Sequence, residues 1–258
     1  MVSAVRKVCL LTYAVAAYFV AIVSLLYIMG FLADVGVPKG ISDGPIDVWW
    51  RAALIDAALV GLFGLHHSIT ARTSFKRRWT RIVPPSLERS TYLYMSAAMT
   101  VLLVWAWRPI NITLWHVRSQ LLEGIIHLAY IAVWIVMAAA TFHFGHFSFF
   151  GLAQAWERLR KTPPPPSEMT TRYLYALVRH PISLCWMTAA LVTPHLTVGH
   201  LTFAVSTWLY IVLATPFEEA DLIEALGESY LEYQKRTPSF LPSLDNAHRK
   251  RTTAARVD

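Results

Sequence analysis

Residues 179–219 read RHPISLCWMTAALVTPHLTVGHLTFAVSTWLYIVLATPFEE. The middle of this stretch is almost entirely apolar, with turn-forming residues near its centre. Charged residues flank it at both ends, with Arg179-His180 before it and Glu218-Glu219 after it. Ionisable groups at the rim of a bilayer are costly and mark functional sites. The pattern therefore predicts a short membrane hairpin whose polar ends hold a ligand at the membrane surface.

The composition of the whole chain fits a membrane protein better than a soluble domain. Apolar residues make up 55% of the 258 residues and charged residues only 15%. A spanning helix needs about 20 mostly apolar residues. We predict an all-α, polytopic membrane helical bundle with a cytoplasmic C-terminal helix over residues 218–236. The six predicted membrane segments, of which the fifth is short for a span, are Val8–Leu32, Trp49–His66, Thr91–Trp107, Leu121–His143, Ile182–Pro194 and His200–Phe217.

The net charge of +7 could indicate a nucleic-acid partner, but the placement of the basic residues argues against one. They gather in alternate connections, at Arg72–Arg89 and Arg158–Arg179, and in the tail from Lys235 to Arg256. The other connections contain few of them. This is the positive-inside pattern of membrane proteins, so we expect an integral membrane protein with both termini in the cytoplasm and no nucleic acid bound.

The chain shows no internal repeat. We expect one membrane domain over residues 1–242, followed by a polar, disordered tail over residues 243–258. Within the longest connection, Leu152–Arg160 has a helical pattern and leads into Pro163–Pro166. Four consecutive prolines favour an extended spacer and exclude a helix.

The predicted topology brings polar residues from three parts of the chain to one membrane face, where a single site could include all of them. A lone interfacial histidine is more often structural, and no spacing suggests a metal site, so the convergence carries the argument. The three groups are His66-His67-Ser68 with Arg72, then His143 and His146 with Gln154, and finally Arg179-His180 with Glu218-Glu219.

Two interpretations fit the charged ends of the hairpin. In the first, Arg179 reaches the interface, Pro181 begins a helix and the glutamates solvate a helix end. In the second, the helix N-terminus and Arg179 receive a carboxylate, while Glu218 or Glu219 holds a cationic or hydroxylated group. An amino-acid-like cofactor would carry both kinds of group.

The last third of the chain resembles the membrane methyltransferases related to isoprenylcysteine carboxyl methyltransferase and the phospholipid methyltransferases. The resemblance rests on an RHP motif, a hydrophobic hairpin and a Glu-Glu pair. It implies that S-adenosylmethionine binds at the cytoplasmic face to Arg179, His180, Pro181, Glu218 and Glu219.

A narrower resemblance covers nearly the whole chain and points to the methanethiol S-methyltransferase branch, beside the NnrU-like membrane proteins. It implies methyl transfer to a small thiol such as methanethiol, giving dimethyl sulfide, at a bacterial inner membrane. His67 and His146 are then the candidate bases, with Arg72 supplying a positive field. The motifs that carry it include His67-Ser68, Ala71-Arg72, Glu88-Arg89-Ser90, Trp107-Arg108-Pro109, His146-Phe147, Phe150-Gly151-Leu152 and Val198-Gly199-His200.

Three residues depart from the pattern of this branch, namely Ser148, Ser183 and Cys185. Other functions therefore stay open at this point. The acceptor could instead be a lipid or a prenylcysteine carboxylate. The protein could also be a non-enzymatic accessory protein that binds haem through residues such as His66 or His143, or a structural membrane protein without a ligand. The sequence leaves the oligomeric state open.

Overall fold

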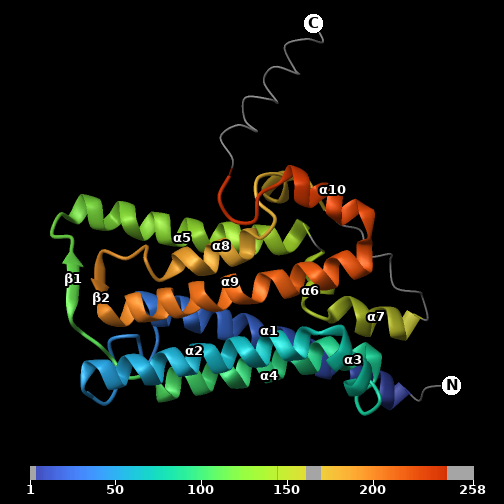
Figure 1. The fold of residues 1–258 in the computed structure, drawn as a ribbon. Helices are drawn as coiled ribbons and strands as arrows, with labels where there is room; N and C mark the ends of the chain where they lie inside the picture. The colour runs from blue at the N-terminus through green and yellow to red at the C-terminus, as the bar shows by residue number, and fades with distance from the viewer. Residues whose placement is uncertain (1–3, 144, 161–169, 243–258) are drawn as a thin grey trace, which may run out of the picture.

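The computed structural model describes residues 4–143, 145–160 and 170–242. Its long helices run side by side along one axis (Figure 1). They are α1 (Ala4–Ala33), α2 (Trp49–Ala71), α4 (Pro85–Ala106), α5 (Gln120–His143) and α9 (Val198–Leu226). The predicted helical bundle is confirmed.

Four helices in the described part of the chain, α1, α2, α5 and α9, are long and apolar enough to cross a membrane. They carry many exposed large apolar side chains, such as Phe19, Leu54, Leu128 and Leu209, which suits a surface that faces lipid. The predicted count of six segments is not confirmed. Helix α4 has 22 residues but does not reach the same apolarity.

The fifth predicted segment contains only a nine-residue helix, α8 (Pro181–Ala189). At about 1.5 Å per residue such a helix covers less than half of a hydrocarbon core of about 30 Å. The chain then continues to β2 (His195–Thr197), which pairs antiparallel with β1 (Thr113–His116). The sequence did not predict these strands, because pairing between such short segments depends on residues far apart in the chain.

The sixth segment also differs from its prediction. Instead of ending at Phe217, α9 continues through Pro216 to Leu226. The break comes at Gly227, whose φ of +61° is a left-handed conformation that favours glycine. Helix α10 (Glu228–Arg236) follows it. Glu218 and Glu219 therefore lie within a continuous helix and not at the start of a new one.

Several short helices lie near one end of the bundle, including α3 (Thr73–Trp79), α6 (His146–Phe149) and α7 (Leu152–Arg160), and a 3-10 turn covers Tyr173–Ala176. The predicted helix at Leu152–Arg160 is confirmed. The predicted spacer at Pro163–Pro166 and the predicted tail 243–258 lie outside the described residues.

The core between the long helices is closed by aromatic and aliphatic side chains. Trp107 at the end of α4 is fully buried, stacks edge-on against Phe31 and donates its indole N–H to the carbonyl of Ile41 over 3.0 Å. An indole buried with its polar group satisfied contributes strongly to packing. This contact ties α1, the first loop and α4 together at the end of the bundle near β1 and β2.

The opposite end of the bundle gathers the chain segments predicted to form the site. The C-terminal ends of α2 and α5, the start of α8 and the C-terminal part of α9 all lie toward the end that carries α3 and α10 (Figure 1). The chain segments that carry the three polar groups thus lie toward the same end of the bundle.

Candidate active site

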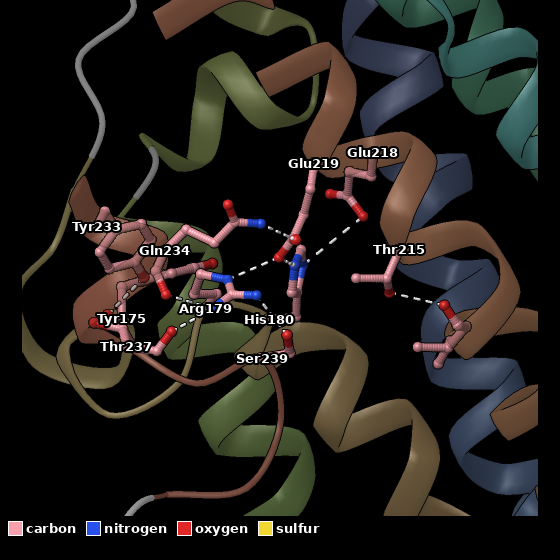
Figure 2. A network of polar contacts seen from close by, with 11 residues as sticks. Tyr175, Arg179, His180, Thr215, Glu218, Glu219, Tyr233, Gln234, Thr237 and Ser239 are labelled. Carbon is pink, nitrogen blue, oxygen red and sulfur yellow. Dashed lines mark hydrogen bonds and ion pairs between the residues drawn. The ribbon is translucent and has the colours of Figure 1, made fainter. Parts of the chain in front are cut away.

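Arg179 and His180 stand at the start of α8 and reach across to α9. The Arg179 Nε–H donates to Glu219 Oε1 over 2.7 Å, and His180 Nε2 lies 3.0 Å from the same oxygen (Figure 2). Pro181 occupies the first position of α8, where its missing N–H costs nothing. Because α8 begins at Pro181, the side chains of Arg179 and His180 just before it point toward Glu219.

The remaining donors of Arg179 hold the C-terminal segment. Its guanidinium donates to the carbonyls of Gln234 and Thr237 and to Ser239 Oγ. With the bond to Glu219, these contacts use four of the five N–H groups of an arginine. Most of the hydrogen-bond donors of Arg179 are therefore already used within the protein.

The backbone of the RHP motif is engaged by the same segment. The N–H groups of Arg179 and His180 donate to the carbonyls of Pro238 and Ser239 over 2.8 and 3.1 Å. Phe240 packs against the His180 ring at a tilt, with the ring centroids 5.7 Å apart. The segment that follows α10 thus covers the start of α8.

The two adjacent glutamates have different surroundings. The Glu219 side chain is only 10% exposed and binds Arg179, His180 and the Gln234 amide, which donates over 2.7 Å. The Glu218 side chain is 60% exposed, and one of its carboxylate oxygens lies 3.8 Å from His180 Nδ1. Glu218 is the carboxylate of this pair that a ligand could reach.

Two tyrosines of α10 complete this part of the site. The Tyr233 hydroxyl donates to the carbonyl of Tyr175 over 2.6 Å, and burial raises the pKa of Tyr233 to about 12. The Tyr230 hydroxyl is buried and has no hydrogen-bond partner among the residues that the structure describes, and the charged groups near it are Glu219, Arg179 and Glu218. A buried hydroxyl without a partner is unusual and is available to a ligand that enters beside it.

Arg72, at the end of α2, also contacts α9 next to the glutamates. Its Nη1 donates to the carbonyl of Phe217 and lies 3.0 Å from Asp221 Oδ2, and the guanidinium stacks over the Phe217 ring. Asp221 offsets much of its positive charge. Arg72 therefore joins α2 to the turn of α9 that carries Glu218.

His67 faces α4 from the last turns of α2. Both of its ring nitrogens lie within hydrogen-bond distance of the Tyr92 hydroxyl, at 2.7 and 2.9 Å, and its ring stacks on Phe63. A hydroxyl has a single proton, so it can donate to only one nitrogen at a time. The neighbouring Ser68 instead faces α9, where its Oγ lies 3.0 Å from the Tyr210 hydroxyl.

His146 lies on another side of the bundle, and each of its ring nitrogens has a hydrogen-bond partner. The Thr141 hydroxyl donates to the carbonyl of Ala138 and so accepts the Nδ1–H of His146 over 2.8 Å. The opposite nitrogen, Nε2, then accepts from the Tyr18 hydroxyl over 3.0 Å. Burial lowers the pKa of His146, which favours this neutral form.

The predicted site residues are thus only partly assembled. Arg179, His180, Glu218 and Glu219 form one network, and Arg72 reaches the same turn of α9. Within the described residues, no hydrogen bond or ring contact joins His146 to that network. Likewise, His143 Nδ1 donates to Ala139 of its own helix.

Sequence reasoning missed the residues that bind through their backbone. Gln234, Thr237, Pro238 and Ser239 contribute mainly carbonyl groups, which every residue type carries, so no residue type marks them in the sequence. Tyr92 and Tyr210 were missed because aromatic residues are common in apolar helices. Only their hydroxyl contacts with α2 distinguish them.

Comparison with known proteins identifies the family. The chain is 40% identical over 242 residues to the methanethiol S-methyltransferase of Pseudomonas deceptionensis, covering 94% of the chain and 92% of the relative. The chain belongs to the methanethiol S-methyltransferase family. The enzyme of that name from Mycobacterium tuberculosis is 37% identical and matches over 89% of the chain and 94% of its own length.

More distant similarity extends beyond methanethiol S-methyltransferases. Nurim from Danio rerio is 27% identical over 72% of the chain and 68% of its own length. No protein-family model matches the chain, and no solved structure matches it. The predicted resemblance to the methanethiol branch of membrane methyltransferases is therefore confirmed, because the relatives match over nearly their whole length.

Proposed function

We propose that this protein transfers the methyl group of S-adenosylmethionine to a small thiol such as methanethiol, giving dimethyl sulfide. The observation that carries the proposal is the exposed Glu218 carboxylate beside the buried Arg179–His180–Glu219 network. The relatives that are methanethiol S-methyltransferases support the reaction class and the acceptor.

The residues around Glu218 suit the cofactor chemically. Glu218 would bind an ammonium or a ribose hydroxyl, and the unpartnered Tyr230 hydroxyl would supply a further polar contact. Arg179 and Glu219 would mainly hold the frame, because most of their hydrogen-bonding groups are already used. Pro181 and His180 fix the start of α8 beside them.

When bound, S-adenosylmethionine supplies an electrophilic methyl group, whose bond to the sulfonium breaks with the electron pair on the departing sulfur as the new bond to the thiol sulfur forms. The protein must bring the thiol into line and remove its proton, because the thiolate is the nucleophile. His67 suits the role of base better than His146. Both ring nitrogens of His67 share one hydroxyl, so one nitrogen can still accept a proton from the thiol. Each ring nitrogen of His146 already has its own hydrogen-bond partner.

Arg72 would contribute mainly by position. Its contacts with Phe217 and Asp221 bring α2, and with it His67, against the part of α9 that carries Glu218. The paired carboxylate reduces the positive field that the sequence suggested for Arg72.

We further propose that the protein is a single membrane domain over residues 1–242 in the inner membrane of a bacterium. The end of the bundle with α3 and α10 would face the cytoplasm, since the basic connection after α2 and the residues of α10 lie there. The active site would then open on the side where S-adenosylmethionine is made and used.

The direct test is to incubate membranes that contain the protein with methyl-labelled S-adenosylmethionine and methanethiol, and to measure labelled dimethyl sulfide in the headspace. Glu218→Gln should abolish most of the signal and weaken cofactor binding. Glu224→Gln is the matched control, because Glu224 is an exposed glutamate of the same helix. We expect that control to behave like the natural protein.

Other outcomes select the alternatives. Cofactor binding without dimethyl sulfide would redirect the search to lipid and prenylcysteine acceptors. A purified protein that binds haem and no cofactor would favour the accessory-protein alternative, for which His66 offers a buried Nδ1 that has no partner in the described part of the chain.

A further inference from the structure

Helices α2 and α9 approach each other closely at Gly64. A Cβ atom added to Gly64 would lie 2.3 Å from the nearest ring atom of Tyr210, far inside van der Waals contact. The aromatic ring of Tyr210 is therefore seated directly against the backbone of α2. Gly64 has no side chain to prevent this approach.

The seated ring is also held at its polar end. The Tyr210 hydroxyl lies 3.0 Å from Ser68 Oγ, one helical turn after Gly64 on the same face of α2. The ring is thus fixed at two points on one neighbouring helix. The Tyr210 ring therefore has a fixed position and orientation.

The Tyr210 ring lies near the residues that we propose for methyl transfer. His67 follows Gly64 by three residues on α2 and binds the Tyr92 hydroxyl of α4. Ser68, the next residue of α2, binds the Tyr210 hydroxyl of α9, and Arg72, one turn further, reaches the turn of α9 that carries Glu218. The last turns of α2 therefore contact one tyrosine hydroxyl on α4 and another on α9, close to the accessible carboxylate.

We infer that the acceptor thiol binds beside His67, between Tyr92 and Tyr210, and that Tyr210 is the residue that limits the size of the thiol. The inference rests on the proposed function and adds the acceptor subsite to it. The aromatic rings favour contact with a sulfur atom, and the hydroxyls can donate to a thiolate. We expect a ring fixed at this position to admit a one-carbon thiol and to exclude longer chains.

The test compares the methylation of methanethiol and 1-propanethiol by the natural protein, Tyr210→Ala and Tyr210→Phe. The ratio of kcat/KM for propanethiol over methanethiol should rise at least about tenfold in Tyr210→Ala, because pockets discriminate by methylene groups on this scale. Tyr210→Phe keeps the ring and should keep the ratio. Tyr94→Ala is the matched control, since Tyr94 is a half-buried tyrosine whose hydroxyl binds Tyr13 on α1.

A second measurement needs no turnover. With cofactor present, methyl propyl sulfide should raise the unfolding temperature of Tyr210→Ala more than that of the natural protein. If Tyr210→Ala does not fold, Tyr210→Leu replaces it in both measurements. An unchanged ratio and unchanged stabilisation in a variant that still binds the cofactor would overturn the inference.

The two levels of the proposal fail in different ways. If the natural protein binds the cofactor but methylates neither thiol, the proposed function itself is wrong and the subsite falls with it. If the natural protein methylates methanethiol and Tyr210→Ala shows no gain with propanethiol, only the subsite is wrong.

Discussion

The Arg179 guanidinium lies 2.7 Å from a carboxylate oxygen of Glu219, forty residues later in the chain. This ion pair joins the start of α8 to the last third of α9, and both side chains are about nine-tenths buried. The same arginine holds the segment after α10. Because Glu219 is committed to this contact, its neighbour Glu218 is left to face outward.

The first prediction separates the two glutamates. Glu219→Ala leaves Arg179 buried without its carboxylate, which typically costs about 3–5 kcal/mol. Glu218→Ala removes an exposed group and should change stability by less than about 1 kcal/mol. Thermal unfolding in detergent micelles measures both. Equal losses of stability in the two variants would contradict the proposed division of roles.

The second prediction concerns Tyr92, whose hydroxyl holds His67 and also borders the proposed acceptor subsite. Tyr92→Phe removes the hydroxyl that both ring nitrogens share. We expect kcat to fall by about a hundredfold, in line with the contribution of a well-placed base, while cofactor affinity stays the same. The pH dependence of kcat should move as well, which a purely structural role would not cause. Tyr94→Phe, on the same helix, should leave both quantities unchanged.

The third prediction uses two glycines of α2. Gly64→Ala forces Tyr210 away from α2 and should destabilise the protein by about 1–3 kcal/mol and reduce activity. At Gly61 none of the residues that the structure describes comes within 4 Å of an added Cβ. Gly61→Ala should therefore be neutral or stabilising by up to about 1 kcal/mol, through helix propensity alone. The pair is compared by unfolding temperature and methyl transfer rate.

The fourth prediction concerns pH. Burial lowers the pKa of His146, so the unfolded chain takes up a proton at this residue before the folded protein does. The free energy of unfolding should therefore decrease as the pH falls below about 6.5, until the lowered pKa of the folded state is passed. His146→Asn should show a shallower decrease between pH 7 and 5. A decrease as steep as in the natural protein would assign it to other groups.

Much of this architecture follows from local properties of the chain. Apolar length and composition predict membrane segments at Val8–Leu32, Trp49–His66 and Leu121–His143, because a helix satisfies its own backbone hydrogen bonds in lipid. The structure has a helix over each of them, with somewhat longer bounds. The RHP and Glu-Glu motifs indicate a site, and the alternation of basic connections predicts that the three polar groups share one end of the bundle.

Other features depend on contacts between distant segments. Whether Glu218 or Glu219 is free cannot be read from two identical neighbours, because a third residue, Arg179, selects one of them through a contact across forty positions. His67 and His146 also cannot be told apart from the sequence, because they differ only in their partners. His67 binds Tyr92, whereas His146 binds Tyr18 and Thr141. Residue type and spacing supply the groups that can react. Packing decides which of these groups are used up inside the protein and which remain for a ligand, because hydrogen bonds and burial in a folded chain join residues that the sequence keeps apart.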